Sequence, residues 1–321
     1  MDKNVLLAIG EALIDFIPGQ TGKKIKDVSD FRPVVGGAPA NVCGAFVKLG
    51  GQARMITQLG MDPFGDKILE EFQGYGIDCK AIKRTDKANT SLAFVALAED
   101  GNREFSFYRK PGADMLMEPS WLSPEWFEDG YALHFCSVSL GNYPMKEAHR
   151  KAIQLARQAG MLISFDPNLR RPLWNDDEGL RQAVLEFLPM ADILKISDEE
   201  LSFLTGCETL EDARDQLFQG NVRLIIYTLG SGGASACTRN SRAHADGIPV
   251  KALDTTGAGD AFIGSFLYQL YEQGIGTENL SSLSSEDLEM FLDFSNRYCA
   301  RSIQKKGAIA SYPTKKDMEI R

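Results

Sequence analysis

Residues that bind transition metals or form disulfides are scarce in this sequence. Only three of its 321 residues are histidine, with no HExxH motif or close pair, and the six cysteines show no CxxC spacing. This pattern argues against a zinc site and against a disulfide framework. We expect reduced, mostly buried thiols, which are typical of a cytoplasmic protein.

Long hydrophobic runs are also missing. No stretch approaches the ~18 apolar residues of a membrane span, and the apolar run near the N-terminus is broken by Glu11 and Asp15, unlike a secretory signal. The formal net charge is −9, and this sign repels nucleic-acid phosphates and anionic lipid. We therefore expect neither a nucleic acid nor a membrane as partner.

The composition is that of an ordinary globular protein. Hydrophobic residues make up 44% of the chain and charged residues 25%. At this length, folding buries roughly 75% of the surface that the unfolded chain exposes. No internal repeat, low-complexity tract or Pro/Ser-rich linker divides the sequence. We expect one domain over residues 1–321.

Short apolar runs alternate with amphipathic segments, which predicts strands joined by crossover helices. The runs expected to form buried strands begin at Val5, Ala132, Met161, Ala191 and Arg223. The helices are expected over residues 39–49, 63–75, 144–159 and 199–205. The predicted fold class is α/β, with a doubly wound, mainly parallel central sheet flanked by helices.

Two stretches, at about residues 14–33 and 91–113, break this alternation. The first is rich in turn-forming residues, and the second has two strand-like arms around the turn Glu99-Asp100-Gly101-Asn102. We expect both stretches to form a small β-sheet that stands off the main body as a lid. Two long surface loops are the alternative.

The most informative segment is Asp254 to Phe262, with the sequence DTTGAGDAF. Apolar residues follow at helical spacing from Ala261 onwards, so the glycines lie where a loop enters a helix. Bare amides at a helix N-terminus attract anions, so Gly257 to Asp260 can hold one. The Asp260 carboxylate could cap the helix, worth about 1 kcal/mol. It could instead accept the proton of a hydroxyl that attacks a bound phosphoryl group.

Two segments resemble the signatures of one family. DTTGAGDAF closely resembles the C-terminal signature of the ribokinase-like (PfkB) carbohydrate kinases, and Gly36-Gly37-Ala38-Pro39-Ala40-Asn41 resembles their N-terminal glycine signature. The resemblance covers essentially the whole chain, and the segments 10–15, 165–174 and 197–201 are most similar to bacterial fructokinases. It implies a ribokinase-like body with a lid. It also implies ATP-dependent phosphorylation of a monosaccharide, with fructose as the expected substrate and fructose 6-phosphate as the product.

The resemblance also implies which residues act on the sugar. Asp260 corresponds to the general base of the family, and the amides of Gly257, Ala258, Gly259 and Asp260 correspond to its anion hole. The sugar-binding positions carried over from the family are Asp15, Gly36, Gly37, Asn41, Phe107, Arg109, Arg170 and Asp260.

Nucleotide and metal positions follow from the same resemblance. Glu200 corresponds to a glutamate that supports Mg²⁺ through water, although Ser197 stands where Asn is common in the family. A plain tight turn is the alternative for the glycines that follow Thr228. The ATP-binding positions carried over are Thr228, Gly230, Gly232, Gly257, Gly259, Asn296 and Ala308. The positions of a loop that holds a monovalent cation in many relatives, and so suggests K⁺, are Asp254, Thr256, Ser302, Gly307 and Ser311.

Several alternatives stay open at this stage. On the same fold, the chain could be a 2-keto-3-deoxygluconate kinase, a ribokinase or a nucleoside kinase. A keto acid would need arginines placed for its carboxylate, and Arg109 and Arg170 are available in the sequence. A different class would be an NAD(P)-dependent oxidoreductase, but no GxGxxG follows the first predicted strand. A catalytically silent sugar-binding protein is another alternative, and the presence of Asp260 argues against it.

The expected partners are small molecules, namely a sugar and ATP. Apolar residues of the predicted lid, such as Phe94 and Phe105, could also pair with those of a second copy to form a homodimer.

Overall fold

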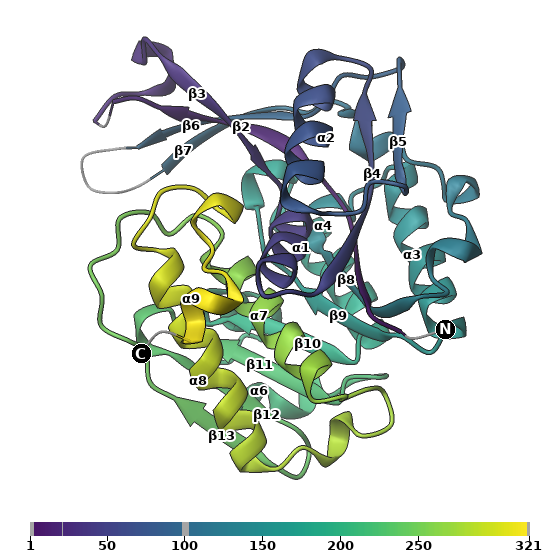
Figure 1. Ribbon diagram of the computed structural model, residues 1–321, viewed down its shortest axis with the longest axis vertical. Coiled ribbons are helices and arrows are strands. Elements are labelled where there is room, and N and C mark those ends of the chain that lie inside the picture. The colour runs from purple at the N-terminus through teal and green to yellow at the C-terminus, as the bar shows by residue number, and fades with distance from the viewer. Residues whose placement is uncertain (1–2, 21, 98–102, 320–321) are drawn as a thin grey trace.

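The computed structural model describes residues 3–20, 22–97 and 103–319 (Figure 1). Within these ranges the main body contains a nine-stranded sheet with the strand order β13-β12-β11-β10-β9-β8-β1-β4-β5. The pairs β11–β12 and β12–β13 are antiparallel, and the other pairs are parallel. The strands are β1 (Val5–Ile9), β4 (Gln52–Gly60), β5 (Ile82–Thr85), β8 (Gly130–Cys136), β9 (Leu162–Asp166), β10 (Ile193–Ser197), β11 (Leu224–Thr228), β12 (Ala234–Cys237) and β13 (Arg242–Ala245).

Helices cover both faces of this sheet (Figure 1). Those of one face, α1, α2, α7 and α8, bury side chains in one hydrophobic core, and α3, α4, α5 and α6 bury theirs in another. The α-helices are α1 (Ala38–Lys48), α2 (Pro63–Tyr75), α3 (Pro144–Gln158), α4 (Asp177–Phe187), α5 (Asp198–Thr205), α6 (Leu210–Leu217), α7 (Ala258–Glu272), α8 (Ser285–Ser302) and α9 (Lys315–Glu319). None of these helices, within the part of the chain that the structure describes, combines the length and the apolar character that a membrane crossing would need.

Strand β1 lies between the two cores and shows why its sequence is continuously apolar. Its side chains alternate, so that Leu6 and Ala8 enter one core while Val5, Leu7 and Ile9 enter the other. A strand that is covered on both faces has no polar side. The prediction of an α/β body with a mainly parallel, doubly covered sheet is confirmed.

The five predicted strands and four predicted helices are all present, with ends shifted by at most a few residues. The glycine-rich segment enters a helix as expected, and α7 begins at Ala258. Asp260 therefore lies within the first turn of the helix.

Strand β4 was not predicted, although it forms a central pair with β1. Its sequence contains Gln52, Arg54 and Gln58, which interrupt the apolar pattern. Arg54 is nevertheless buried, because its guanidinium forms ion pairs with Asp78 at 2.7 Å and with Asp129 at 2.7 Å. These partners are distant in sequence, so the apolar pattern alone did not reveal the strand.

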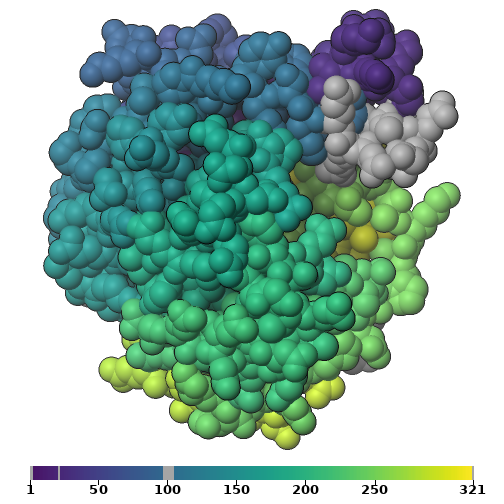
Figure 2. Space-filling view, turned by 180° about the vertical axis from the view of Figure 1, so that it is seen from behind, coloured from purple at the N-terminus to yellow at the C-terminus, as the bar shows by residue number. Residues whose placement is uncertain are grey.

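The four strands outside the main sheet form a second sheet, which we call the lid sheet. Its order is β3-β2-β6-β7, and it falls largely within the two stretches predicted to form a lid. The predicted turn at 99–102 lies outside the described residues. Seen from behind, the surface is hollowed below the purple strands of the lid sheet, where green and yellow C-terminal residues come into view (Figure 2). The strands are β2 (Leu13–Pro18), β3 (Phe31–Gly36), β6 (Leu92–Leu97) and β7 (Arg103–Tyr108).

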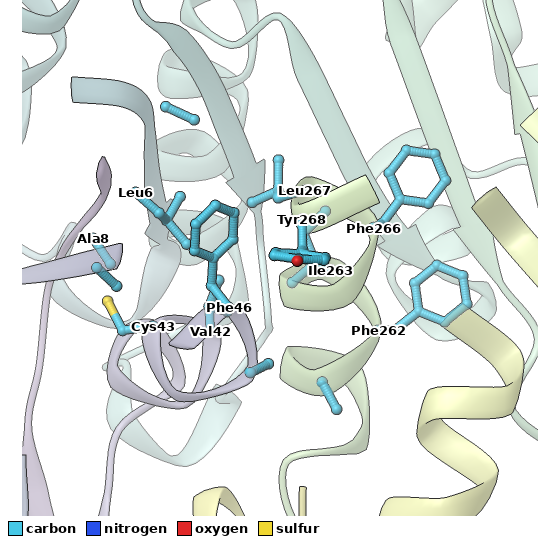
Figure 3. Packing of buried hydrophobic residues seen from close by; sticks show 14 of the residues in the cluster. Leu6, Ala8, Val42, Cys43, Phe46, Phe262, Ile263, Phe266, Leu267 and Tyr268 are labelled. Carbon is cyan, nitrogen blue, oxygen red and sulfur yellow. The ribbon is translucent and has the colours of Figure 1, made fainter. Parts of the chain in front are cut away.

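Close packing of α1 against α7 brings the two glycine signatures together. In Figure 3, Phe46 of α1 lies near Tyr268 of α7, and the two rings are 5.5 Å apart in an edge contact. The helices can approach closely because Gly264 has no side chain: a Cβ on Gly264 would lie 2.6 Å from the Cβ of Ala45. Both helices therefore present their N-terminal turns to one region of the molecule.

Candidate active site

Asp260 lies at the centre of the candidate site, in the first turn of α7. Its side chain is buried, with 6% exposure. One carboxylate oxygen accepts a hydrogen bond from Asn41 Nδ2 at 2.8 Å, and the other accepts one from Asn168 Nδ2 at 3.3 Å. Asp260 thus has two side-chain donors from other elements and does more than cap its own helix.

The pKa of Asp260 is raised by burial to about 6, and the nearby Asp166 carboxylate adds to the rise. The hydrogen bond from Asn41 and the positive charges of Arg170 and Lys195 act in the opposite direction. A carboxyl group with this pKa is ionised at neutral pH and is more basic than an exposed aspartate. Both properties suit a general base.

The turn before Asp260 is shaped by Gly257, which has a left-handed φ of 73°. A Cβ at this position would lie 2.5 Å from the Tyr312 hydroxyl and 2.9 Å from the Cβ of Ala308. The Tyr312 hydroxyl donates to the Gly257 carbonyl at 2.8 Å. Only glycine fits this turn without displacing the C-terminal segment.

The four amides predicted to form an anion hole are not equivalent. The N–H of Ala258 already donates to the Thr255 carbonyl at 3.2 Å. The amides of Gly259 and Asp260 belong to the first turn of α7, where no intrahelical acceptor exists. The geometry therefore favours Gly257, Gly259 and Asp260 over Ala258 as donors to an anion.

The N-terminal signature lies on the other side of Asp260. Gly36 ends β3, and Gly37 is the N-cap of α1. A Cβ on Gly36 would lie 2.1 Å from an Asp15 carboxylate oxygen, and one on Gly37 would lie 2.5 Å from the Glu11 carbonyl. Asp15, Gly36, Gly37 and Asn41 are thus brought close to each other and, through Asn41, to Asp260.

Phe107 and Asp15 share one face of the lid sheet. In the register of the lid sheet, Asp15 pairs with Ala93, and Ala93 pairs with Phe107. The Phe107 ring stacks on Phe105 with centroids 5.7 Å apart. This places the predicted aromatic lid position on the same side of the sheet as the predicted hydroxyl-binding carboxylate.

Arg109 and Arg170 have different surroundings. Arg109 is buried and its guanidinium pairs with the buried carboxylate of Asp114, with Nε 3.0 Å from an oxygen. It also donates to Ser139 Oγ at 3.1 Å. Arg170 is exposed and close enough to Asp260 to lower its pKa. Arg109 is therefore committed to a structural ion pair, whereas Arg170 is accessible to a ligand.

Glu200 holds the loop that follows β9. Its two carboxylate oxygens accept hydrogen bonds from the amides of Leu169 at 3.0 Å and Ser197 at 2.8 Å. Ser197 returns the contact by accepting from the Glu200 amide, which completes a capping box. Each oxygen retains a further lone pair, so a water-mediated contact to a metal ion is compatible with this geometry.

The predicted phosphate loop follows β11. A single 3₁₀ turn spans Gly230–Gly232, and Leu229 separates it from Thr228 at the end of β11. Gly233 has φ 92°, and its Cβ would lie 2.2 Å from the Ala245 carbonyl. The turn is therefore tight enough to need glycine even without a ligand, so a plain turn still explains it.

The two residues predicted to line an adenine pocket, Asn296 and Ala308, make different contacts. Asn296 Nδ2 donates to the carbonyls of Ala245 at 2.9 Å and Asp246 at 3.1 Å, which leaves only its Oδ1 for a nucleotide. The Cβ of Ala308 lies 2.9 Å from the position that a Cβ on Gly257 would take. Ala308 therefore joins the anion-binding turn, and Asn296 chiefly fixes the segment after β13.

The predicted cation loop is tied together by Asp254. Its carboxylate accepts from the Thr256 amide at 3.0 Å and from the Gly307 amide at 2.9 Å. The hydroxyls of Ser302 and Ser311 donate to carbonyls of their own segments. Within the described ranges, no three His, Cys, Asp or Glu side chains converge in a way that could hold a metal ion, so a cation here would depend on carbonyl oxygens.

Three buried polar residues at the site were missed at the level of sequence. Asp166 and Lys195 form an ion pair of 3.0 Å, and Asn168 follows Asp166 with a left-handed φ of 46°. Asp166 ends β9, and Lys195 lies near the end of β10. A polar residue at the carboxyl end of an otherwise apolar strand is the signal that could have identified this pair.

Comparisons with known proteins agree over nearly the full chain. A family model described as pfkB family carbohydrate kinase matches residues 3–315. The protein named Probable fructokinase-2 of Arabidopsis thaliana is 40% identical over 315 residues, which cover 98% of this chain and 94% of that protein.

Solved structures are also similar to this chain over nearly its full length. Fructokinase from Xylella fastidiosa with bound ATP has a TM-score of 0.90 and 33% identity, and the match covers 98% of this chain and 97% of that one. Fructokinase from Vibrio cholerae O395 in a fructose, ADP and calcium ion bound form has a TM-score of 0.86 and 32% identity, with 98% of both chains covered.

Proposed function

The chain belongs to the PfkB family of carbohydrate kinases, and from this premise we propose that it transfers the γ-phosphoryl group of ATP to fructose, giving fructose 6-phosphate and ADP. The observation that carries the proposal is the buried Asp260 carboxylate, held by Asn41 and Asn168 at the start of a glycine-led helix.

In the proposed reaction, Asp260 accepts the proton of the sugar hydroxyl. The hydroxyl oxygen then forms a bond to the γ-phosphorus, while the bond from that phosphorus to the bridging oxygen breaks and ADP leaves. The amides of Gly257, Gly259 and Asp260 stabilise the charge that develops on the transferred group. Asn41 and Asn168 keep the carboxylate oriented toward the hydroxyl throughout.

Sugar binding is assigned to the face between the lid sheet and α1. Asp15, Gly36, Gly37 and Asn41 offer hydroxyl-binding groups there, Phe107 offers an apolar surface, and Arg170 is accessible from the loop after β9. Arg109 supports this arrangement indirectly, through its ion pair with Asp114. Because Arg109 is already paired, the site favours an uncharged sugar over a keto acid that needs two free arginines.

ATP binding is assigned to two turns. One follows the carboxyl end of β11, and the other precedes the N-terminus of α7. Thr228, Gly230 and Gly232 line one turn and Gly257 the other, with Ala308 between Gly257 and the C-terminal segment. Asn296 acts indirectly, by fixing the segment after β13.

Mg²⁺ would neutralise charge on the ATP phosphates. Glu200 could help to hold Mg²⁺ through water. Each of its carboxylate oxygens accepts one hydrogen bond from a backbone amide and can accept a second from metal-bound water. K⁺ is assigned to the loop that Asp254 ties to Gly307, with carbonyl oxygens as ligands and Thr256, Ser302 and Ser311 as its supports.

Closure of the lid sheet over the sugar would exclude water and so suppress ATP hydrolysis. We take lid and body as one domain, because only residues 10–12 separate β1 from β2 and the ring centroids of Phe16 in β2 and Phe64 in α2 are 5.6 Å apart. The exposed edge of the lid sheet, which carries Phe105 and Tyr108, is assigned to a homodimer contact.

A substrate panel tests the proposed function. ATP turnover is followed through coupled ADP detection with fructose, ribose, 2-keto-3-deoxygluconate and adenosine, each over a range of concentrations. Fructose is expected to give the highest kcat/KM, and turnover is expected to stop on chelation of Mg²⁺. A higher kcat/KM for another acceptor would replace fructose, and no ATP turnover with any acceptor would overturn the kinase function.

A further inference from the structure

Lys195 is a buried lysine that the proposed mechanism does not yet use. It lies on β10, and its ammonium forms an ion pair with Asp166 Oδ2 at 3.0 Å. The two side chains are 7% and 1% exposed. A buried ion pair contributes little net stability compared with apolar residues of similar size, so this pair calls for another reason to be there.

The ammonium of Lys195 lies directly against the anion-binding turn. A Cβ built on Gly259 would be 3.3 Å from Lys195 Nζ. A Cβ at residue 259 would make a tight contact with the ammonium, which would have to shift by a few tenths of an ångström. This contact places a fixed positive charge one residue from Asp260.

A chain of hydrogen bonds connects Lys195 to the same base. Asp166 uses one oxygen for Lys195 and the other to accept from the Asn168 amide at 3.1 Å. Asn168 adopts a left-handed φ of 46°, and from there its side-chain amide donates to Asp260 at 3.3 Å. Lys195 thus holds the carboxylate of Asp166 in place, and Asp166 in turn holds Asn168, which donates to Asp260.

The charges around Lys195 are mostly negative. Its neutral neighbours stay uncharged near neutral pH, because burial lowers the pKa of His134 to about 3 and raises that of Cys299 to about 12. Without the ammonium, the buried carboxyl groups of Asp166 and Glu200 would lose the positive charge that they face. The titratable groups that face Lys195 are Asp166 of β9, Glu200 of α5, Asp260 of α7, His134 and Cys136 of β8, and Cys299 of α8.

We propose that Lys195 is a positioning residue for phosphoryl transfer: it orients Asn168 on Asp260 through Asp166, and its ammonium against Gly259 adds, with Arg170, positive charge beside the base. This inference rests on the proposed function, since it gives Asp260 the role of base. It extends that function by making the ion pair Lys195–Asp166 part of the catalytic apparatus.

The pH profile of Lys195→Met tests the inference. Loss of a nearby cation raises the pKa of a carboxyl group, so the acid limb of kcat/KM is expected to move to higher pH. The rate at pH 6.5 should fall more than the rate at pH 8.5. Lys195→Arg keeps the charge and should move the limb less. Lys146→Met removes a lysine from the half-buried pair with Glu186 and should leave the limb in place.

A second variant separates charge from folding. In Lys195→Met/Asp166→Asn both charges of the pair are removed together, so the acid limb should return toward that of the parent, even where the single variant folds poorly. An unshifted acid limb in a folded Lys195→Met protein would overturn the inference, as would equal limbs in the single and double variants.

A measurement that needs no turnover distinguishes this inference from the proposed function. The titration of the Asp260 carboxyl group is followed through the ¹³C chemical shift of its carboxyl carbon, in protein labelled with ¹³C-aspartate. The Asp260→Asn variant identifies the signal. An upward shift of its midpoint in Lys195→Met supports the inference, and an unchanged midpoint refutes it. A parent enzyme without ATP turnover would refute the proposed function alone.

Discussion

The side-chain amide of Asn41 donates to the carboxylate of Asp260 at 2.8 Å, although 219 positions separate the two residues in the sequence. Each residue lies in the first turns of a helix, Asn41 in α1 and Asp260 in α7. The contact depends on the close packing of these helices around Gly264 and Ala45. One hydrogen bond therefore joins the N-terminal and C-terminal signatures into a single site.

Removal of the base should abolish turnover without abolishing sugar binding. Asp260→Ala is expected to lower kcat by about 10²–10⁴-fold, which is the usual contribution of a general base, and to leave the fructose affinity measured by calorimetry within a few-fold of the parent. In the parent, activity should decline below about pH 6, where Asp260 becomes protonated. Asp293→Ala, at a half-exposed aspartate of α8, is the control. A near-parental kcat for Asp260→Ala would show that another group is the base.

The raised pKa of Asp260 also predicts how stability depends on pH. The folded protein binds this proton more tightly than the unfolded chain, because the pKa rises from 3.8 to about 6 on folding. Asp260 therefore lowers the free energy of unfolding as pH rises from about 4 to about 6, by up to about 3 kcal/mol.

Asp260→Asn lacks this titration. Its stability relative to the parent should increase between pH 4 and pH 6 and stay constant above pH 7, as measured by urea denaturation at several pH values. A difference between the two proteins that does not change with pH would contradict the prediction.

Gly257→Ala should damage the anion-binding turn. The new Cβ would be strained by the left-handed φ and would collide with Tyr312 and Ala308, so we expect a higher KM for ATP, a lower kcat and a reduced Tm.

Gly274→Ala provides the matched control for this change. Gly274 also has a left-handed φ, of 66°, but nothing lies within 4 Å of its Cβ position. It should lose about 1–2 kcal/mol from backbone strain and keep the parental KM. Equal KM values in the two variants would show that the turn at Gly257 does not contact ATP.

Arg109→Met should destabilise the protein strongly, because it leaves the carboxylate of Asp114 buried without its partner. Loss of one member of a buried pair typically costs about 3–5 kcal/mol, measurable as a drop in the free energy of unfolding. Arg242→Met removes an arginine from the exposed pair with Glu211 and should cost about 0–1 kcal/mol. A similar small cost for Arg109→Met, together with a raised KM for fructose, would indicate that Arg109 binds the sugar directly.

Much of the fold could be predicted from local pattern. Continuous apolar runs identified five strands of the main sheet, and proline and glycine at the ends identified four helices, because these signals act within a few residues of the chain. Strand β4 escaped prediction because Arg54 is buried only through partners at Asp78 and Asp129. That information is absent from the strand itself.

The candidate site shows the same division. The sequence determined which residues occur in the two signatures, and hence the family, because glycines that admit no Cβ and an adjacent carboxylate are local requirements. The tertiary structure alone decided that Asn168 and Lys195 surround Asp260, that Arg109 is paired with Asp114, and that Ala258 is a poor anion donor. Hydrogen bonds, ion pairs and the desolvation that raises the pKa of Asp260 all depend on atoms from distant segments, and only folding brings those atoms together.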